Sequence, residues 1–312
     1  MTRESTLFSR FEDDLRSANT RKISAEAYAR HYREWGGSFI VHPEVLRFFE
    51  HTYDVKVSYR GYFRNGQCVG AVPIWGQFVA GDRSALQANH LQDKEDFGYP
   101  VICLPIDPRY RCTVLYKAKY LLNLQRRQIG GAIFSGFKAM SILKRIPDDL
   151  PGKTQYQLKQ RRFERLGGVV RDVQDFCGEE IAAIYIDLFQ QRWQRSPHAA
   201  ASLVNTFSTL KQFLFGKVLW LNDRPIAIQI NYRTETNRTI CIDYVNGGMD
   251  KTSKNISPGA LLHYINGCNA WEESQRTNKL LIYSFGKANM EYKDQWCHRV
   301  PRGLTGFWLP AI

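Results

Sequence analysis

The second half of the sequence holds a carboxylate whose position suggests chemistry. Asp243 lies inside an apolar run, where an unpaired carboxylate is costly, so it is either functional or salt-bridged. A carboxylate in such a place can act as a general base that removes a proton, and a nearby hydrogen-bond donor can hold a developing oxyanion. Asp243 could serve as the base, and the neighbouring Tyr244 could donate a hydrogen bond. Each residue could instead have only a structural role.

A second group of candidate residues follows the last predicted strand. Lys287 ends that strand beside Gly286, a place suited to contacting a substrate. Glu291 and Lys293 come shortly afterwards and could close the site from the last loop. The predicted catalytic residues are Asp243, Tyr244, Lys287 and Glu291, and the predicted substrate-binding residues are Gly286, Lys293 and Trp296. Packing in the core or at its rim is the alternative role for the tryptophan.

Two segments are suited to binding a phosphate-bearing donor. Ser257 and the following Pro258 predict a helix start with serine as the N-cap, and the backbone N–H groups of a helix start suit phosphate. A basic helix is predicted over residues 155–165, and the planar fork of arginine binds two phosphate oxygens at once. The predicted donor-binding residues are Arg161, Arg162, Arg165, Ser257 and Gly259. The alternatives are an ordinary capped helix and a solvated basic helix face.

The composition limits the class of partner. Lys and Arg outnumber Asp and Glu by 43 to 30, and the net charge of +13 favours an anionic or phosphate-bearing donor, an anionic membrane lipid or tRNA. A generally basic, soluble surface is the alternative. The histidines show no ligand spacing and no GxSxG, HExxH or Walker-type motif is present, so we predict no metal and disfavour hydrolase or nucleoside-triphosphatase chemistry.

Cysteine usage and hydropathy suggest the cellular location. The seven cysteines are scattered without a CxxC pair, which argues for a reducing compartment. The start of the chain lacks the apolar segment of a signal peptide, and no run approaches the roughly 20 apolar residues of a spanning helix. These features predict a cytoplasmic protein, or one bound peripherally to the inner face of a membrane.

Two hairpin-like segments suggest that the chain repeats one α/β unit. Tyr62–Ala71 and Leu219–Ile228 each read as strand, tight turn and strand, and Ile133–Ala139 is echoed by Ile282–Ala288. The offset of about 150 residues is typical of tandem domains. The order hairpin, strand, helix, strand is that of the GNAT-type acyltransferase fold. Chance likeness of two short hairpins is the alternative.

The predicted fold class is therefore α/β (α+β), with tandem GNAT-like domains whose mixed central sheets carry helices on both faces. We predict a polar arm over residues 1–20, an N-terminal domain over 21–150 and a C-terminal acyltransferase domain over 151–312.

The local pattern also predicts individual elements. In the first domain it predicts a long loop over 80–99, a strand over 101–106 and a helix over 115–128. In the second domain it predicts a long helix from Pro258 and a last regular strand over 280–285.

Several motifs together resemble one bacterial family. They are Trp35–Ile40, Ala80–Arg83, Asp96–Pro100, Ile242–Gly248, Ser257–Gly259, Tyr283–Ala288 and Tyr292–Cys297. Spread over most of the chain, they resemble the Mig (macrophage-inducible gene) family of Gram-negative bacteria. The resemblance implies resistance to cationic antimicrobial peptides, a role in virulence through survival in macrophages, and association with the inner membrane.

More distantly, the second half is similar to the GNAT-superfamily branch of Fem-like and BioF-like acyltransferases. This resemblance implies acyl or aminoacyl transfer, with acyl-CoA, acyl carrier protein or aminoacyl-tRNA as the donor. The usual pyrophosphate loop, Arg/Gln-x-x-Gly-x-Gly/Ala, is absent before Pro258, which leaves the donor open. A tRNA partner is compatible with the basic helix but is not favoured, and the oligomeric state is open.

We therefore expect an antimicrobial-peptide resistance protein that transfers an acyl or aminoacyl group to an amine on a cell-envelope component or peptide. The rival is a non-catalytic binding or regulatory protein at the inner membrane that reuses the fold. An enzyme would need a pocket that joins Ser257 to Asp243 and Lys287, whereas a region closed by side chains would favour the rival.

Overall fold

The computed structural model describes residues 20–146, 150, 152–253 and 255–306. Apart from Thr20, the predicted polar arm lies outside the described residues. The helices run over α2 (Ala25–Trp35), α3 (Pro43–Tyr53), α4 (Arg83–Ala88), α5 (Lys153–Arg165), α6 (Gly178–Trp193), α7 (Leu203–Thr209), α8 (Pro258–Thr277) and α9 (Tyr292–Trp296).

The strands form one small antiparallel sheet, one large mixed sheet and a short pair. The small sheet has the order β1-β2-β3-β4, from β1 (Thr20–Ile23), β2 (Ser58–Arg64), β3 (Gln67–Trp75) and β4 (Phe78–Val79). The large sheet has the order β6-β14-β8-β13-β12-β11-β10-β9. Its strands are β6 (Ala118–Leu122), β8 (Ile133–Leu143), β9 (Val169–Asp172), β10 (Lys217–Leu221), β11 (Arg224–Glu235), β12 (Thr239–Met249), β13 (Leu280–Lys287) and β14 (Cys297–Thr305). The short pair joins β5 (Cys112–Thr113) and β7 (Ile129–Gly130).

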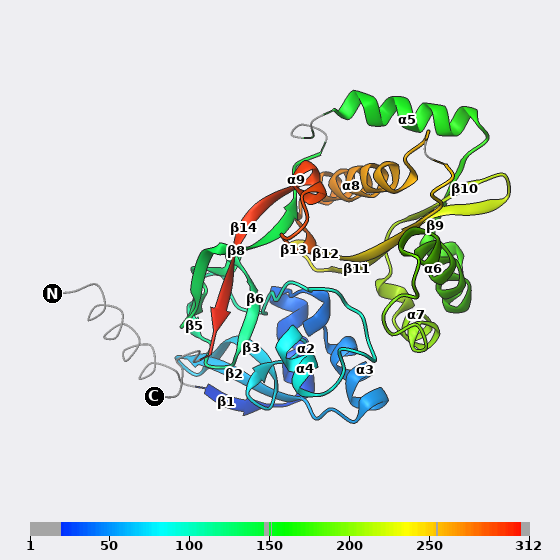
Figure 1. Ribbon diagram of the computed structural model, residues 1–312. Coiled ribbons are helices and arrows are strands. Elements are labelled where there is room, and N and C mark those ends of the chain that lie inside the picture. Colours follow the sequence, from blue (N-terminus) through cyan, green and yellow to red (C-terminus); the bar gives the residue numbers. More distant parts are fainter. Residues whose placement is uncertain (1–19, 147–149, 151, 254, 307–312) are drawn as a thin grey trace.

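Helices cover both faces of the large sheet, which confirms the predicted fold class. Figure 1 shows α8 on one side of the sheet and α6 and α7 on the other, with α5 lying outside α8. The two faces have separate apolar cores. Ile240 and Ile242 of β12 pack with the α8 residues, whereas Cys241 packs with the cluster that contains α6. Alternation along β12 therefore sends successive side chains into different cores.

Both predicted hairpins form, and their turns explain why. Asn65 and Gly66 have φ values of 50° and 80°, and Asn222 and Asp223 have values of 51° and 56°. Two consecutive left-handed residues match the right-handed twist of the flanking strands, and Asn, Asp and Gly tolerate that conformation best.

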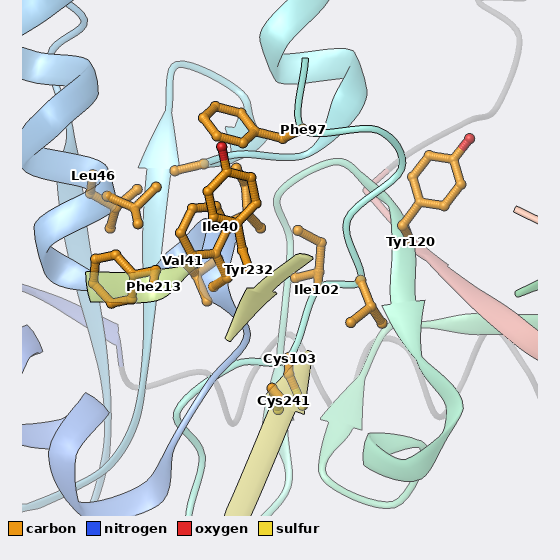
Figure 2. Packing of buried hydrophobic residues seen from close by; sticks show 14 of the residues in the cluster. Ile40, Val41, Leu46, Phe97, Ile102, Cys103, Tyr120, Phe213, Tyr232 and Cys241 are labelled. Carbon is orange, nitrogen blue, oxygen red and sulfur yellow. The ribbon is translucent and has the colours of Figure 1, made fainter. Parts of the chain in front are cut away.

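An aromatic core joins the first half of the chain to the second. The ring of Phe39 stacks on that of Tyr232 in β11, with centroids 4.1 Å apart, and Phe97 and Phe213 pack around this pair. Figure 2 shows the rings of Phe97, Phe213 and Tyr232 together, with Cys103 and Cys241 side by side below them. The halves therefore share one buried interface.

Three element predictions in the first half are wrong. Residues 118–122 form β6 instead of a helix, because this segment bonds to Ile102 on one edge and to β14 on the other. Residues 101–106 form isolated bridges at Ile102 and Ile106 instead of a strand. The predicted loop over 80–99 contains α4, which Asp82 caps by accepting a hydrogen bond from the Ser84 amide at 2.8 Å.

The end of the chain also differs from the prediction. β13 is not the last strand, because β14 follows it and pairs with both β6 and β8. Pro301, Arg302 and Gly303 conceal this strand in the sequence, since proline, glycine and charge argue against a central strand. The division into domains at residues 150 and 151 stays a prediction. β8 belongs to the first domain by sequence, but it lies in the sheet that the second domain builds.

Candidate functional site

Two neighbouring parallel strands separate in the middle of the large sheet. β12 and β13 pair from Thr239 and Leu280 as far as Asp243 and Ser284. Beyond this point β12 continues to Met249, and β13 runs on to Lys287 while it stays paired with β8 on its other edge. A bulge in β12 beside Tyr244 shifts its register against β11 at the same level. We call this place the strand divergence.

Asp243 lies at the last paired position before the strand divergence. Asp243 is only 3% exposed. Its Oδ1 accepts a hydrogen bond from the Val101 amide at 3.1 Å. Oδ2 is buried and has no hydrogen-bond partner. Burial raises the pKa of this carboxyl to about 7, with the Val101 amide partly opposing the rise. A carboxyl with this pKa can exchange a proton near neutral pH.

A segment of the first half, Asp96–Val101, crosses the strand divergence. We call it the strap. Gly98 packs on Val245 of β12, and a Cβ added to Gly98 would lie 3.4 Å from the Val245 Cα. Tyr99 packs on Gly286 of β13, and a Cβ added to Gly286 would lie 3.2 Å from the Tyr99 Cβ. Both glycines have positive φ values, 64° and 71°. The strap holds the separated strands from the face that carries Asp243.

Aromatic rings fill the opposite face of the divergence around one histidine. The ring centroid of His263, in α8, lies 5.1 Å from those of Tyr244 and Phe285 and 5.5 Å from that of Trp296. His263 is 7% exposed, and its Nδ1 is buried without a hydrogen-bond partner. Burial lowers the pKa of this imidazole to about 3, so it is neutral at physiological pH. Such a ring can bind a substrate by a single hydrogen bond.

His263 was missed in the sequence because it lacks ligand spacing with other histidines. The signal that could have found it is an imidazole among the apolar residues of α8.

Arg192 was also missed. It reaches the divergence from α6 and donates from Nη1 to the Gly247 carbonyl at 2.9 Å. Burial raises the pKa of Tyr244, which Arg192 partly opposes.

Lys293, predicted to bind substrate, instead bonds to the backbone of β13. Its Nζ donates to the carbonyls of Phe285 at 2.6 Å and Lys287 at 2.9 Å. Lys293 is 9% exposed, and burial lowers the pKa of its ammonium group. It therefore holds the separated end of β13 in place.

We expect Lys293→Met to destabilise the protein by roughly 2 kcal/mol, because two buried carbonyls lose their donor. The exposed Lys287→Met is the control and should change stability by less than about 0.5 kcal/mol. Urea unfolding of both variants checks this. Equal stabilities would show that the ammonium does not hold β13.

Ser257 is the N-cap residue of α8, as predicted, and Pro258 follows at the first helical position. The residue has φ 52° and ψ 61°, however, and its side chain makes no capping hydrogen bond. Its Oγ instead accepts a hydrogen bond from Lys159 of α5 at 3.3 Å. Gly259 faces β12, where an added Cβ would lie 2.8 Å from the Met249 sulfur. Arg161, Arg162 and Arg165 are exposed on α5 beyond Lys159.

The predicted site residues thus lie in several separate places. Tyr244, Lys293 and Trp296 lie near His263, whereas Asp243 faces the strap. Lys287 is exposed at the end of β13, and Glu291 is exposed just before α9. The predicted donor-binding residues lie at the start of α8 and on α5. The chemical roles of all these residues stay predictions.

A cavity of about 810 Å³ lies at the other end of the sheet, where β12 begins. Its lining includes Arg233, Lys217 and Glu273, and both cations are paired with carboxylates. It does not adjoin Ser257, Asp243 or Lys287. In the part of the chain that the structure describes, no group of three His, Cys, Asp or Glu side chains could hold a metal ion. Among the same residues, no helix has the length and apolar character needed to span a bilayer.

The arrangement of β12, α8 and the diverging β13 is that of the GNAT-like and Fem-like acyltransferase fold. The crystal structure of FemX is similar with a TM-score of 0.51 at 9% identity, covering 92% of this chain and 96% of that chain. The chain belongs to the Mig-14 family, whose profile matches residues 42–304. This confirms the family resemblance.

Two further solved structures resemble the chain less closely. L-PGS from Bacillus licheniformis has a TM-score of 0.45 at 11% identity, with 91% of this chain and 92% of that chain covered. The C-terminal domain of a putative lysylphosphatidylglycerol synthetase from Agrobacterium fabrum has a TM-score of 0.44 at 11% identity, with coverages of 96% and 91%. No curated protein matches the chain by sequence.

Proposed function

We propose that this protein transfers an acyl or aminoacyl group from a phosphate-bearing donor to an amine at the strand divergence. The observation that carries the proposal is the buried Oδ2 of Asp243, which has no partner at the point where β12 and β13 separate. A buried carboxylate without a partner is costly, and an incoming amine would supply the missing donor.

In the proposed reaction the amine nitrogen attacks the carbonyl carbon of the donor. A C–N bond forms, and the bond from that carbon to the donor's sulfur or oxygen breaks. Asp243 takes the proton that the amine loses, which its pKa of about 7 permits near neutral pH. Because Tyr244 and His263 lie on the face opposite Asp243, the reacting carbonyl would lie in the gap between β12 and β13. From that face Tyr244 gives a proton to the leaving group and recovers one from solvent, and His263 offers its Nδ1 to the bound group as a hydrogen-bond partner.

The donor's phosphates would bind at the start of α8. Lys159 already reaches Ser257 there, and Arg161, Arg162 and Arg165 follow on the same helix. Acyl-CoA, acyl carrier protein and aminoacyl-tRNA all carry phosphate and fit this feature. We further propose that the acceptor amine belongs to a cell-envelope component or a peptide. The protein would act in resistance to antimicrobial peptides, at the cytoplasmic face of the inner membrane.

Thermal unfolding with a panel of donors tests donor binding. The panel contains acetyl-CoA, palmitoyl-CoA, acyl carrier protein and charged tRNA. A donor present at a hundred times its Kd should stabilise the protein by about 2.7 kcal/mol. We expect Lys159→Met to reduce the shift and Lys153→Met, at the first residue of α5, to keep it. A panel that shifts nothing would contradict the proposal.

A non-catalytic binding protein is the second candidate, and one observation favours it. Side chains close the region between Ser257, Asp243 and Lys287, where Tyr244, His263 and Trp296 are all buried. Chemistry there requires the strap or the aromatic rings to move. A donor that binds but is never consumed in the presence of an amine would favour this second candidate.

A further inference from the structure

A buried arginine near the strap hydrogen-bonds to the Tyr120 side chain but keeps several N–H donors without acceptors. Arg302, in β14, is 6% exposed, and its Nε and Nη1 are buried without partners. Nε carries one N–H donor and Nη1 carries two. Charged donors that are buried and unpaired destabilise the folded state. The position therefore calls for an anion.

Two tyrosine rings connect Arg302 to further cations. Its guanidinium carbon lies 4.6 Å from the ring centroid of Tyr120, and that ring lies 5.6 Å from the ring of Tyr99 in the strap. Arg83 lies 4.3 Å from the Tyr99 ring, and the Lys287 ammonium lies 6.0 Å from it. Three cations thus gather around two adjoining rings.

The carboxylates nearby are already occupied. Asp82, which acts electrostatically on Tyr120, accepts from the amides of Ser84 at 2.8 Å and Lys119 at 2.7 Å. Asp96 accepts from the Gly98 amide at 2.9 Å. Among the described residues, no ion pair joins a carboxylate to Arg83, Lys287 or Arg302. The three cations outnumber these two carboxylates, so the cluster carries a net positive charge.

We propose that Arg302, with Arg83 and Lys287, forms a binding subsite for a phosphate group next to the strap. Phosphate fits better than carboxylate because it offers more oxygens to several N–H donors and carries more charge. The ring of Tyr120 covers the guanidinium, and the ring of Tyr99 in the strap adjoins it. The ligand therefore enters when the strap and Tyr99 move aside. This subsite does not depend on the proposed transfer chemistry.

Isothermal titration with four small probes tests the subsite: inorganic phosphate, O-phosphoethanolamine, ethanolamine and acetate. We expect both phosphate probes to bind the wild type, and ethanolamine and acetate to bind at least about tenfold more weakly, a difference of 1.4 kcal/mol. Tighter binding of O-phosphoethanolamine than of inorganic phosphate would identify a ligand that carries phosphate and amine together. Equal binding would identify a site for the phosphate group itself.

Arg302→Met should abolish phosphate binding and raise the melting temperature measured without ligand, because it removes an uncompensated buried charge. Arg299→Met is the matched control, since Arg299 lies on the same strand and is paired with Asp294. It should bind phosphate as the wild type does.

The proposal is overturned if the wild type binds no phosphate, or if Arg302→Met keeps binding. A lower melting temperature for Arg302→Met would also overturn it, by showing that packing on Tyr120 is the role of this side chain. Asp243→Asn should keep phosphate binding, which separates this proposal from the transferase proposal.

Discussion

Replacing Asp243 with asparagine is expected to give a protein that is more stable at pH 8 than the wild type and transfers the acyl group at least about 100-fold more slowly. Asparagine keeps an oxygen for the Val101 amide but cannot ionise. The wild-type carboxyl keeps its proton in the folded state up to pH about 7, whereas an ordinary carboxyl loses it near 3.8. The folded state therefore binds more protons between these pH values, and wild-type stability falls as the pH rises through them.

The size of this effect follows from the two pKa values. A carboxyl whose pKa rises from 3.8 to about 7 loses on the order of 4 kcal/mol of stability across that window. Urea unfolding of both proteins from pH 4 to pH 8 should show curves that start together and separate steadily. Asp243→Ala should gain less, because the Val101 amide then loses its acceptor at a cost of about 1–3 kcal/mol. Parallel curves for wild type and Asp243→Asn would show that the carboxyl is not forced to stay neutral.

The second large effect is expected at Gly248, where β12 packs directly against the backbone of α6. A Cβ added there would lie 2.6 Å from the carbonyl carbon of Leu188 and 2.6 Å from the amide nitrogen of Phe189. Backbone atoms cannot move aside as a side chain can. We expect Gly248→Val to cost about 3 kcal/mol or more and to displace α6, together with Arg192, from the divergence.

Gly66→Ala is the control for this prediction. Gly66 has φ 80° and no atom within 4 Å of an added Cβ, so the substitution brings backbone strain without a clash. It should cost about 1–2 kcal/mol. Urea unfolding compares the two variants. If Gly248→Val were no less stable than Gly66→Ala, the close approach of β12 and α6 would be unimportant for stability.

The elements with a strong local signal could be predicted from the sequence. The paired left-handed residues at Asn65-Gly66 set a hairpin whatever surrounds them, and Pro258 sets the start of α8. Residues 118–122 could not be predicted, because their strand exists through pairing with β14, a partner about 180 residues away in the chain. Long-range pairing leaves no local pattern.

The candidate site was predictable only in part. Asp243 stood out because a carboxylate in an apolar strand needs a reason, and burial supplies one. The strap was invisible, since nothing in Asp96–Val101 indicates that it crosses two strands of the second half. His263 and Arg302 became candidates because each has buried nitrogen atoms without a hydrogen-bond partner. Only the folded structure shows this.

The most direct test of the transferase account is a single-turnover assay with the donor that the binding panel identifies. The donor carries a labelled acyl group, n-octylamine serves as a simple acceptor, and mass spectrometry measures the labelled amide. We expect the wild type to form the amide and Asp243→Asn to form it at a rate at least about 100-fold lower, with donor binding intact. Equal rates for the two proteins, or a wild type that binds the donor and forms no amide, would contradict it.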